Sequence, residues 1–168
     1  MVNPSYSDEL ATIRHFTSTG YIVNKGRVLL HWHPKVKAFL PPGGHVEINE
    51  DPVQAVLREV KEETGLLVEI INSELPIKSR YPVQIPPPIT IMIEDIIDAD
   101  GSIHQHIDFI YFCRPIKDVI LDEAWIWVTQ RQITDRVPLK VSANLEVPPP
   151  EDVRSLSLRA LSLVGEMD

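Results

Sequence analysis

The sequence predicts a single α/β domain in which helices pack on a mixed β-sheet. Two segments carry apolar residues at the spacing of an amphipathic helix, one ending at Gly65 and one close to the C-terminus. Runs rich in β-branched and aromatic residues lie before and after the first of these segments, as in a mixed sheet covered by helices. The 168 residues are enough for one domain with a sizeable core and short for two. One domain is therefore expected over residues 1–168, with a polar tail at residues 1–8.

Composition narrows the classes of function. The net charge of −8 argues against stable nucleic-acid binding and against binding to an anionic membrane. No apolar run approaches the roughly 18 residues of a membrane span, and the N-terminus has no signal-peptide pattern. The lone cysteine, Cys113, lies in an apolar run and is expected to be a buried strand residue. These features favour a cytoplasmic protein.

Before the first helix, the chain predicts a β-hairpin and a bend. Residues 11–24 form the first expected strand, Asn24-Lys25-Gly26 the turn, and residues 27–33 the second strand. Residues 34–37 are an expected loop that contains two lysines. The sequence Pro41-Pro42-Gly43-Gly44 then predicts a bend in which the backbone can approach a ligand closely.

The first helix has clear signals at both ends. Asp51 is the expected N-cap, Pro52 suits the first helical position, and Gln54 completes a capping box. Gly65 is the expected C-terminal stop. The apolar positions follow the spacing of a core-facing stripe: Val53, Val56, Leu57 and Val60.

The remaining chain predicts strands, a long loop and two further helices. The expected elements are a strand at 66–71, a proline-rich loop at 72–88, long strands at 89–97 and 103–114, a strand at 123–129, a short helix at 130–136 and an amphipathic helix at 151–165. The loop is longer than most connections and is therefore functional or mobile. Trp125 and Trp127 share one strand face, where core packing is the default interpretation.

Four carboxylates surround the first helix. Glu50 precedes it, and Glu59, Glu62 and Glu63 lie on one side of it, because positions i, i+3 and i+4 are neighbours on a helix. Like charges this close repel and destabilise the helix. A divalent cation would remove that repulsion, so the pattern indicates a metal site.

The segment Gly44–Leu66 resembles the Nudix box, whose pattern is Gly-x5-Glu-x7-Arg-Glu-U-x-Glu-Glu-x-Gly-U with U apolar. Every fixed position matches: Gly44, Glu50, Arg58, Glu59, Glu62, Glu63 and Gly65, with Val60 and Leu66 at the apolar positions. The resemblance implies a Nudix α/β/α sandwich with a mixed β-sheet between helices. It also implies a MutT-like, metal-dependent pyrophosphohydrolase that uses Mg²⁺ or Mn²⁺.

The resemblance implies roles for individual residues. Glu59, Glu62 and Glu63 are the expected metal ligands, with the carbonyl of Gly43 as a further ligand. Arg58 is expected to orient the glutamates through charge-assisted hydrogen bonds. The general base stays open between Glu59 and a carboxylate outside the box, for which Glu123 is the candidate. Three residues are expected at the substrate side of the site: His45, Gly44 and Glu50.

The sequence leaves the substrate open. A nucleoside triphosphate, ADP-ribose, a nucleotide sugar and a dinucleoside polyphosphate all contain the diphosphate that the resemblance implies. The rival hypothesis is a nucleotide-binding regulatory module that keeps the fold without turnover, although such a module usually has a broken box. An isoprenoid diphosphate isomerase would need a cysteine before the box, and Cys113 lies far downstream. The resemblance also implies a homodimer, because Nudix proteins are often dimers, whereas the sequence itself does not indicate the oligomeric state.

Two histidine pairs alternate along expected strands, so that each pair shares a face: His31 with His33, and His104 with His106. Two ligands do not make a zinc site, and a surface or sheet-packing role is the favoured interpretation.

Overall fold

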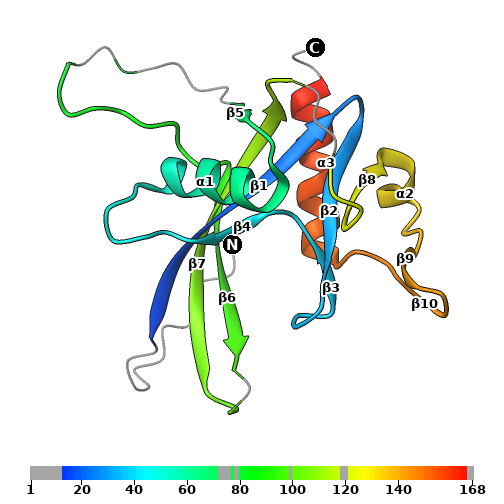
Figure 1. Ribbon diagram of the computed structural model, residues 1–168. Helices are drawn as coiled ribbons and strands as arrows, with labels where there is room; N and C mark the ends of the chain where they lie inside the picture. Colours follow the sequence, from blue (N-terminus) through cyan, green and yellow to red (C-terminus); the bar gives the residue numbers. More distant parts are fainter. Residues whose placement is uncertain (1–12, 72–76, 78–79, 99, 118–120, 166–168) are drawn as a thin grey trace, which may run out of the picture.

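The computed structural model describes residues 13–71, 77, 80–98, 100–117 and 121–165. The expected polar tail at 1–8 lies outside these residues, as does part of the proline-rich loop. The elements, in chain order, are β1 (Arg14–Asn24), β2 (Arg27–His33), β3 (Ala38–Leu40), β4 (Gly43–His45), α1 (Pro52–Thr64), β5 (Val68–Ile70), β6 (Thr90–Ile97), β7 (Ile103–Pro115), β8 (Trp125–Thr129), α2 (Gln130–Thr134), β9 (Leu139–Ser142), β10 (Leu145–Val147) and α3 (Glu151–Gly165) (Figure 1).

Strand β1 is the centre of a mixed sheet of eight described strands. It runs parallel to β7 from the pair Arg14–Gln105 to the pair Ile22–Cys113. It is antiparallel to β2 at one end and to β4 along its middle. The other strands extend the sheet from these neighbours, since β5 and β6 pair with β7, and β3 and β8 pair with β2. The predicted mixed sheet is confirmed.

Helices cover both faces of this sheet, so the predicted α/β/α sandwich is confirmed (Figure 1). Successive residues of a strand point to opposite faces. Ile22 therefore packs with α1, and its neighbours in β1 pack with α3. At Gly20 the helix comes so close that an added Cβ would lie 3.0 Å from a methyl carbon of Val56 and 3.1 Å from one of Val60. The missing side chain at residue 20 sets the distance between helix and strand.

The first helix has the boundaries that its capping residues predict. The side chain of Asp51 accepts hydrogen bonds from the backbone N–H groups of Val53 and Gln54, and the side chain of Gln54 accepts one from the N–H of Asp51. At the other end, Gly65 is left-handed, with a φ of 72°, and its N–H donates to the carbonyl of Lys61. The position of each box glutamate along α1 follows from these two ends.

Most other predicted elements are present, with some differences. The hairpin β6–β7, the strand β8, the short helix α2 and the helix α3 all form where they were expected. The bend before the box contains two short strands, β3 and β4, which were not predicted. The hairpin β9–β10 was also missed. Cys113 is fully buried, as predicted. Within the described residues, no helix has the length and apolarity to cross a membrane.

Candidate functional site

Arg58 is the centre of the acidic site. Its guanidinium donates to both oxygens of Glu50, with Nε–Oε1 at 2.7 Å and Nη2–Oε2 at 2.9 Å. It also donates through Nη1 to Oε1 of Glu59 at 2.7 Å and to Oε2 of Glu62 at 3.3 Å, and through Nη2 to the carbonyl of His45 at 3.0 Å. One cation thus joins three carboxylates and the end of β4.

The pKa values of this group follow from its contacts. The hydrogen bonds from Arg58 lower the pKa of Glu50, assisted by the N–H of Glu47 and by the positive charge. The same contacts with Glu50 and Glu59 raise the pKa of Arg58 further above its already high value. Arg58 therefore remains charged at every accessible pH, and Glu50 remains ionised well below neutrality.

Glu63 points away from Arg58, toward the glycine bend. One oxygen accepts a hydrogen bond of 3.2 Å from the N–H of Gly43. Partial desolvation raises the pKa of Glu63; the Gly43 N–H opposes this shift, and the negative charges of Glu59 and Glu62 add to it. Glu63 as a whole is exposed, while its carboxylate faces the glycine bend.

The two glycines before the helix allow β4 to touch the acidic face. A Cβ added to Gly44 would collide with the carboxylate of Glu59, at both Oε1 and Cδ. A Cβ added to Gly43 would lie 2.7 Å from the carbonyl oxygen of Ser18 and 2.8 Å from Oγ1 of Thr19. Any side chain at either position would displace β1, β4 or Glu59. The backbone of this bend therefore lies close to β1 and Glu59, and its close approach to a ligand stays a prediction.

Other contacts fix the helix that carries the glutamates. Ser18, fully buried in β1, donates from Oγ to the carbonyl of Pro52 at 2.7 Å, at the first turn of α1. Trp125 in β8 donates from its indole nitrogen to the carbonyl of Glu63 at 3.0 Å, near the last turn. From the sequence, core packing was the default interpretation of Trp125, and stacking on a base was the alternative. A buried tryptophan usually needs a hydrogen-bond acceptor for its indole N–H, and this need was the available signal that Trp125 also contacts the helix.

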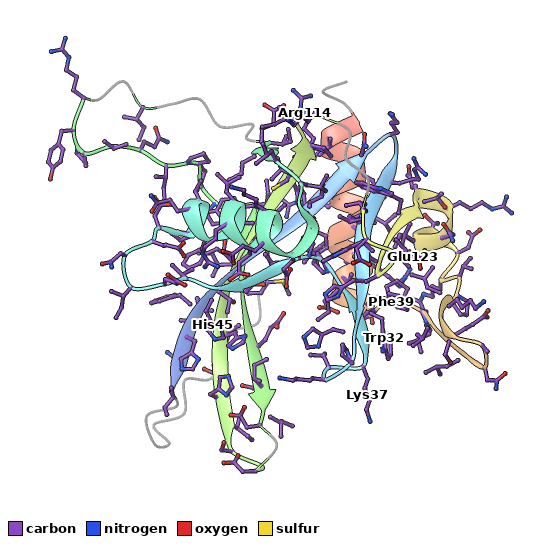
Figure 2. All side chains as sticks on the ribbon, in the orientation of Figure 1. Trp32, Lys37, Phe39, His45, Arg114 and Glu123 are labelled. Atoms are coloured by element: carbon purple, nitrogen blue, oxygen red, sulfur yellow. The ribbon has the colours of Figure 1, made fainter. Side chains whose placement is uncertain are left out.

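The residues outside the helix lie at two ends of the site. His45 follows the two glycines, and its carbonyl accepts from Arg58. Glu123 is exposed in the turn before β8, two residues before Trp125, and lies on the β8 side of α1 (Figure 2). Its role as a general base stays a prediction.

A buried carboxylate behind the glycine bend was not singled out from the sequence. Asp108 in β7 accepts a hydrogen bond of 2.8 Å from Thr19, which pairs with Gly43 across β1 and β4. Burial raises the pKa of Asp108, and hydrogen bonds from Thr19 and Thr17 oppose the shift. The only sequence signal was one acid within a largely apolar strand.

The side chains fit a hard divalent cation by their chemistry. Glu59, Glu62 and Glu63 offer carboxylate oxygens, the donors that Mg²⁺ and Mn²⁺ prefer, and the Gly43 carbonyl lies in the same bend. Arg58 and Gly43 hold these carboxylates apart, so they do not converge on one point. A bound cation would also relieve the repulsion that Glu59 and Glu62 exert on Glu63.

Three comparisons with known proteins agree with this architecture. A family model described as the NUDIX domain matches residues 14–144, which is more than half of the chain. A hydrolase of the NUDIX family from Clostridium perfringens superposes with a TM-score of 0.70 and 30% identity, covering 90% of this chain and 98% of that one. A MutT protein from Methanosarcina mazei Go1 superposes with a TM-score of 0.56 and 18% identity, over 90% of this chain and 95% of that one, a likeness of fold alone.

A curated relative from Lactococcus lactis subsp. cremoris (strain MG1363) is named "Probable DHNTP pyrophosphohydrolase". It is 28% identical over 95 residues, which are 56% of this chain and 51% of that protein. The chain thus spans about half the length of this relative.

The fold is that of a class of hydrolases that act on acid anhydrides in phosphorus-containing compounds. The chain belongs to the NUDIX family.

The Glu50–Arg58 pair predicts a pH-dependent contribution to stability. A lowered folded-state pKa means that the stabilisation is present above the unfolded pKa of about 4.3 and is lost as pH falls through the folded value. We expect Glu50→Gln to be less stable than the wild type at pH 7, and this difference to shrink as pH falls below about 4. Urea unfolding at a series of pH values measures it. Glu47→Gln, at an exposed neighbour, is the control, and its difference in unfolding free energy from the wild type should not shrink as pH falls. If this difference shrank equally in both variants, the stabilising role of the Glu50–Arg58 pair would be contradicted.

The glycine contact predicts a second effect. Gly44→Ala should displace the Glu59 carboxylate and lower turnover of a diphosphate substrate at least tenfold, since small misplacements of catalytic groups are costly. Steady-state kinetics with saturating metal provides the test. Gly165→Ala is the matched control, because an added Cβ meets nothing within 4 Å there. Wild-type turnover in Gly44→Ala would show that Glu59 need not hold its observed position.

Proposed function

We propose that this protein is a metal-dependent pyrophosphohydrolase, which cleaves the diphosphate bond of a nucleoside diphosphate linked to another moiety. The observation that carries the proposal is the unbroken box in its folded form: Glu59 and Glu62 held by Arg58, Glu63 facing Gly43, and β4 in contact with Glu59. A regulatory module without turnover would not need this arrangement.

Mg²⁺ is the proposed cofactor, with Mn²⁺ as its substitute, and Glu59, Glu62, Glu63 and the Gly43 carbonyl would hold it. When bound, the ion supplies neutralisation of phosphate charge and a more acidic water. Arg58 fixes the orientation of Glu59 and Glu62 through charge-assisted hydrogen bonds. Glu50 in turn holds the guanidinium in one plane through two parallel hydrogen bonds.

The proton of the attacking water passes to a carboxylate. Glu59 is one candidate because it lies at the glycine bend with only a small part of its side chain exposed. Glu123 is the other, exposed in the turn before β8. The two are distinguished by pH–rate profiles of Glu59→Gln and Glu123→Gln, since only loss of the base removes the acidic limb while substrate binding is retained.

The substrate is proposed to be a small nucleotide-type anhydride. The Lactococcus relative is named for DHNTP. DHNTP therefore joins nucleoside triphosphates, ADP-ribose, nucleotide sugars and dinucleoside polyphosphates as a candidate. The test is phosphate release, coupled to a pyrophosphatase or a phosphatase, over this panel with and without Mg²⁺. Metal-dependent turnover of one class supports the proposal and names the substrate. Folded protein that binds nucleotide and turns over no member would favour the regulatory module instead.

Glu62→Gln provides the sharpest variant. Glu62 is largely exposed and its described side-chain contact is with Arg58, so the fold should tolerate the change. We expect turnover to fall about a hundredfold or more, since charge stabilisation by a bound metal contributes several kcal/mol. Glu69→Gln, the same chemical change at an exposed acid paired with Arg114, is the control. Near wild-type turnover in Glu62→Gln would overturn the role of Glu62.

A further inference from the structure

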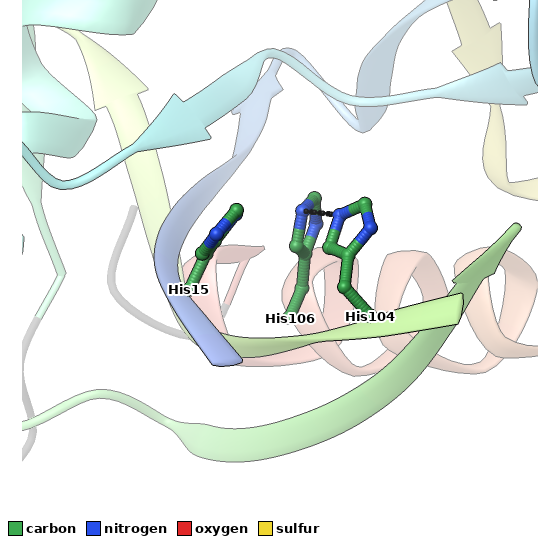
Figure 3. Close-up of side chains that lie close together, drawn as sticks. All are labelled: His15, His104 and His106. Carbon is green, nitrogen blue, oxygen red and sulfur yellow. Dashed lines mark hydrogen bonds between the residues drawn. The ribbon is translucent and has the colours of Figure 1, made fainter. Parts of the chain in front are cut away.

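A group of three histidines lies at the ends of β1 and β7, outside the acidic site. His15 and His106 are direct partners across the parallel strands, and His104 lies two residues before His106 on the same face. The three rings rise from the sheet on the same side and face one another (Figure 3). Only the pair in β7 was recognised from the sequence. His15 lies about 90 residues earlier in the chain and joins this pair only because β1 is parallel to β7.

The spacing of these rings is that of ligands to a single metal ion. Each histidine offers one ring nitrogen, and the three atoms lie within 4.8 Å of one another. Nε2 of His104 and Nε2 of His106 are 3.2 Å apart, and the ring centres are 5.1 Å apart. The His15 ring centre lies 5.0 Å from that of His104 and 6.1 Å from that of His106.

The distances between His104 and His106 match coordination geometry, as does the ring separation of His15 and His104, whereas the His15 and His106 rings are about 1 Å farther apart. A tetrahedral Zn²⁺ with Zn–N bonds of about 2.0–2.1 Å places its ligand nitrogens about 3.3 Å apart and their ring centres about 5 Å apart. No other trio of histidine, cysteine or acidic side chains in the described part of the chain brings its ligand atoms so close together.

A carboxylate supports the ring of His104 from behind. Nδ1 of His104 lies 2.9 Å from Oδ2 of Asp98, which leaves Nε2 directed at the other histidines. Metal-binding histidines almost always donate their second ring N–H to such a carboxylate, which fixes tautomer and orientation. Asp98 itself is held by Ser102, whose Oγ lies 3.3 Å from Oδ2.

The surroundings favour the neutral form of the His106 ring, which is the form that binds metal. Desolvation and the neighbouring His45, His104 and His15 lower the pKa of His106 to about 4, and Asp98 acts weakly in the opposite direction. Asp98, next to the His104 ring, offers negative charge to balance a dication beside the three imidazoles.

We propose that His15, His104 and His106 form a binding site for a divalent transition-metal ion of the Zn²⁺ type. Imidazole nitrogens suit Zn²⁺, Co²⁺, Ni²⁺ and Cu²⁺, whereas Mg²⁺ prefers oxygen ligands. The site is therefore chemically distinct from the carboxylates of α1 and independent of the proposed hydrolysis. His45 lies beside this group, with its ring centre 5.3 Å from that of His15 and 5.0 Å from that of His106.

The test is Zn²⁺ binding by tag-free protein, measured by competition with a chromophoric chelator. Excess Mg²⁺ is present to occupy oxygen sites. We expect one equivalent of Zn²⁺ to bind to the wild type and to raise its melting temperature, because the ion binds only the folded state. His104→Gln/His106→Gln should weaken binding at least a hundredfold and abolish the thermal shift. Asp98→Ala should weaken binding about ten- to a hundredfold, the usual effect of removing a supporting carboxylate.

The control is His31→Gln/His33→Gln. This pair has the same alternation on β2, with ring centres 5.9 Å apart, so the variant removes two histidines and leaves the proposed site intact. It should bind Zn²⁺ like the wild type. His15→Gln changes an exposed side chain and tests the site should the double variant fail to fold. Absence of Zn²⁺ binding to the wild type, or equal binding by His15→Gln and the wild type, would overturn the proposal.

Discussion

The site depends on one partly buried network of ion pairs, in which Arg58 binds carboxylates that would otherwise repel one another. Glu59, Glu62 and Glu63 lie within two turns of one helix, and like charges at this spacing destabilise a helix. The planar guanidinium offsets this repulsion by donating two parallel hydrogen bonds to Glu50 and one hydrogen bond each to Glu59 and Glu62. A lysine could not reproduce that geometry, because its ammonium is a point charge without the fixed fork of donors. Arg58 therefore stabilises a concentration of acid that the helix alone would not tolerate.

The sheet determines where that acid is presented. Strand β1 reaches the first turn of α1 through Ser18 and pairs with the glycine bend through β4. Close approach at Gly20 and at Gly44 leaves no space for side chains between strand, helix and bend. Since Trp125 fixes the other end of the helix, α1 is held at both ends and along one face. The acidic face is thus positioned by residues that carry no charge.

Local signals explain which parts of this structure were predictable from sequence. The helix α1 was predicted to the residue because Asp51, Gln54 and Gly65 determine its ends by contacts within a few positions. The hairpin β9–β10 was missed because its strands are short, mostly exposed and interrupted by a register shift, so they carry no strong alternation. The box residues were found because their spacing is local. Strand order could not be read from the sequence. It determines the contacts of Trp125 and Asp108 with the site and the pairing of His15 with His106.

His45 links the two donor sets of the protein. Its carbonyl accepts from Arg58, and its ring lies beside His15 and His106. The carboxylates of α1 are hard oxygen donors and the histidines are borderline nitrogen donors, so the two sets suit different classes of ion. An ion at the histidines would tie β1 to β7 next to the residue that ends β4, and β4 is the strand whose glycines contact Glu59 and Glu63. The nitrogen site would therefore act on the oxygen site only through backbone position, because no charged side chain is shared between them.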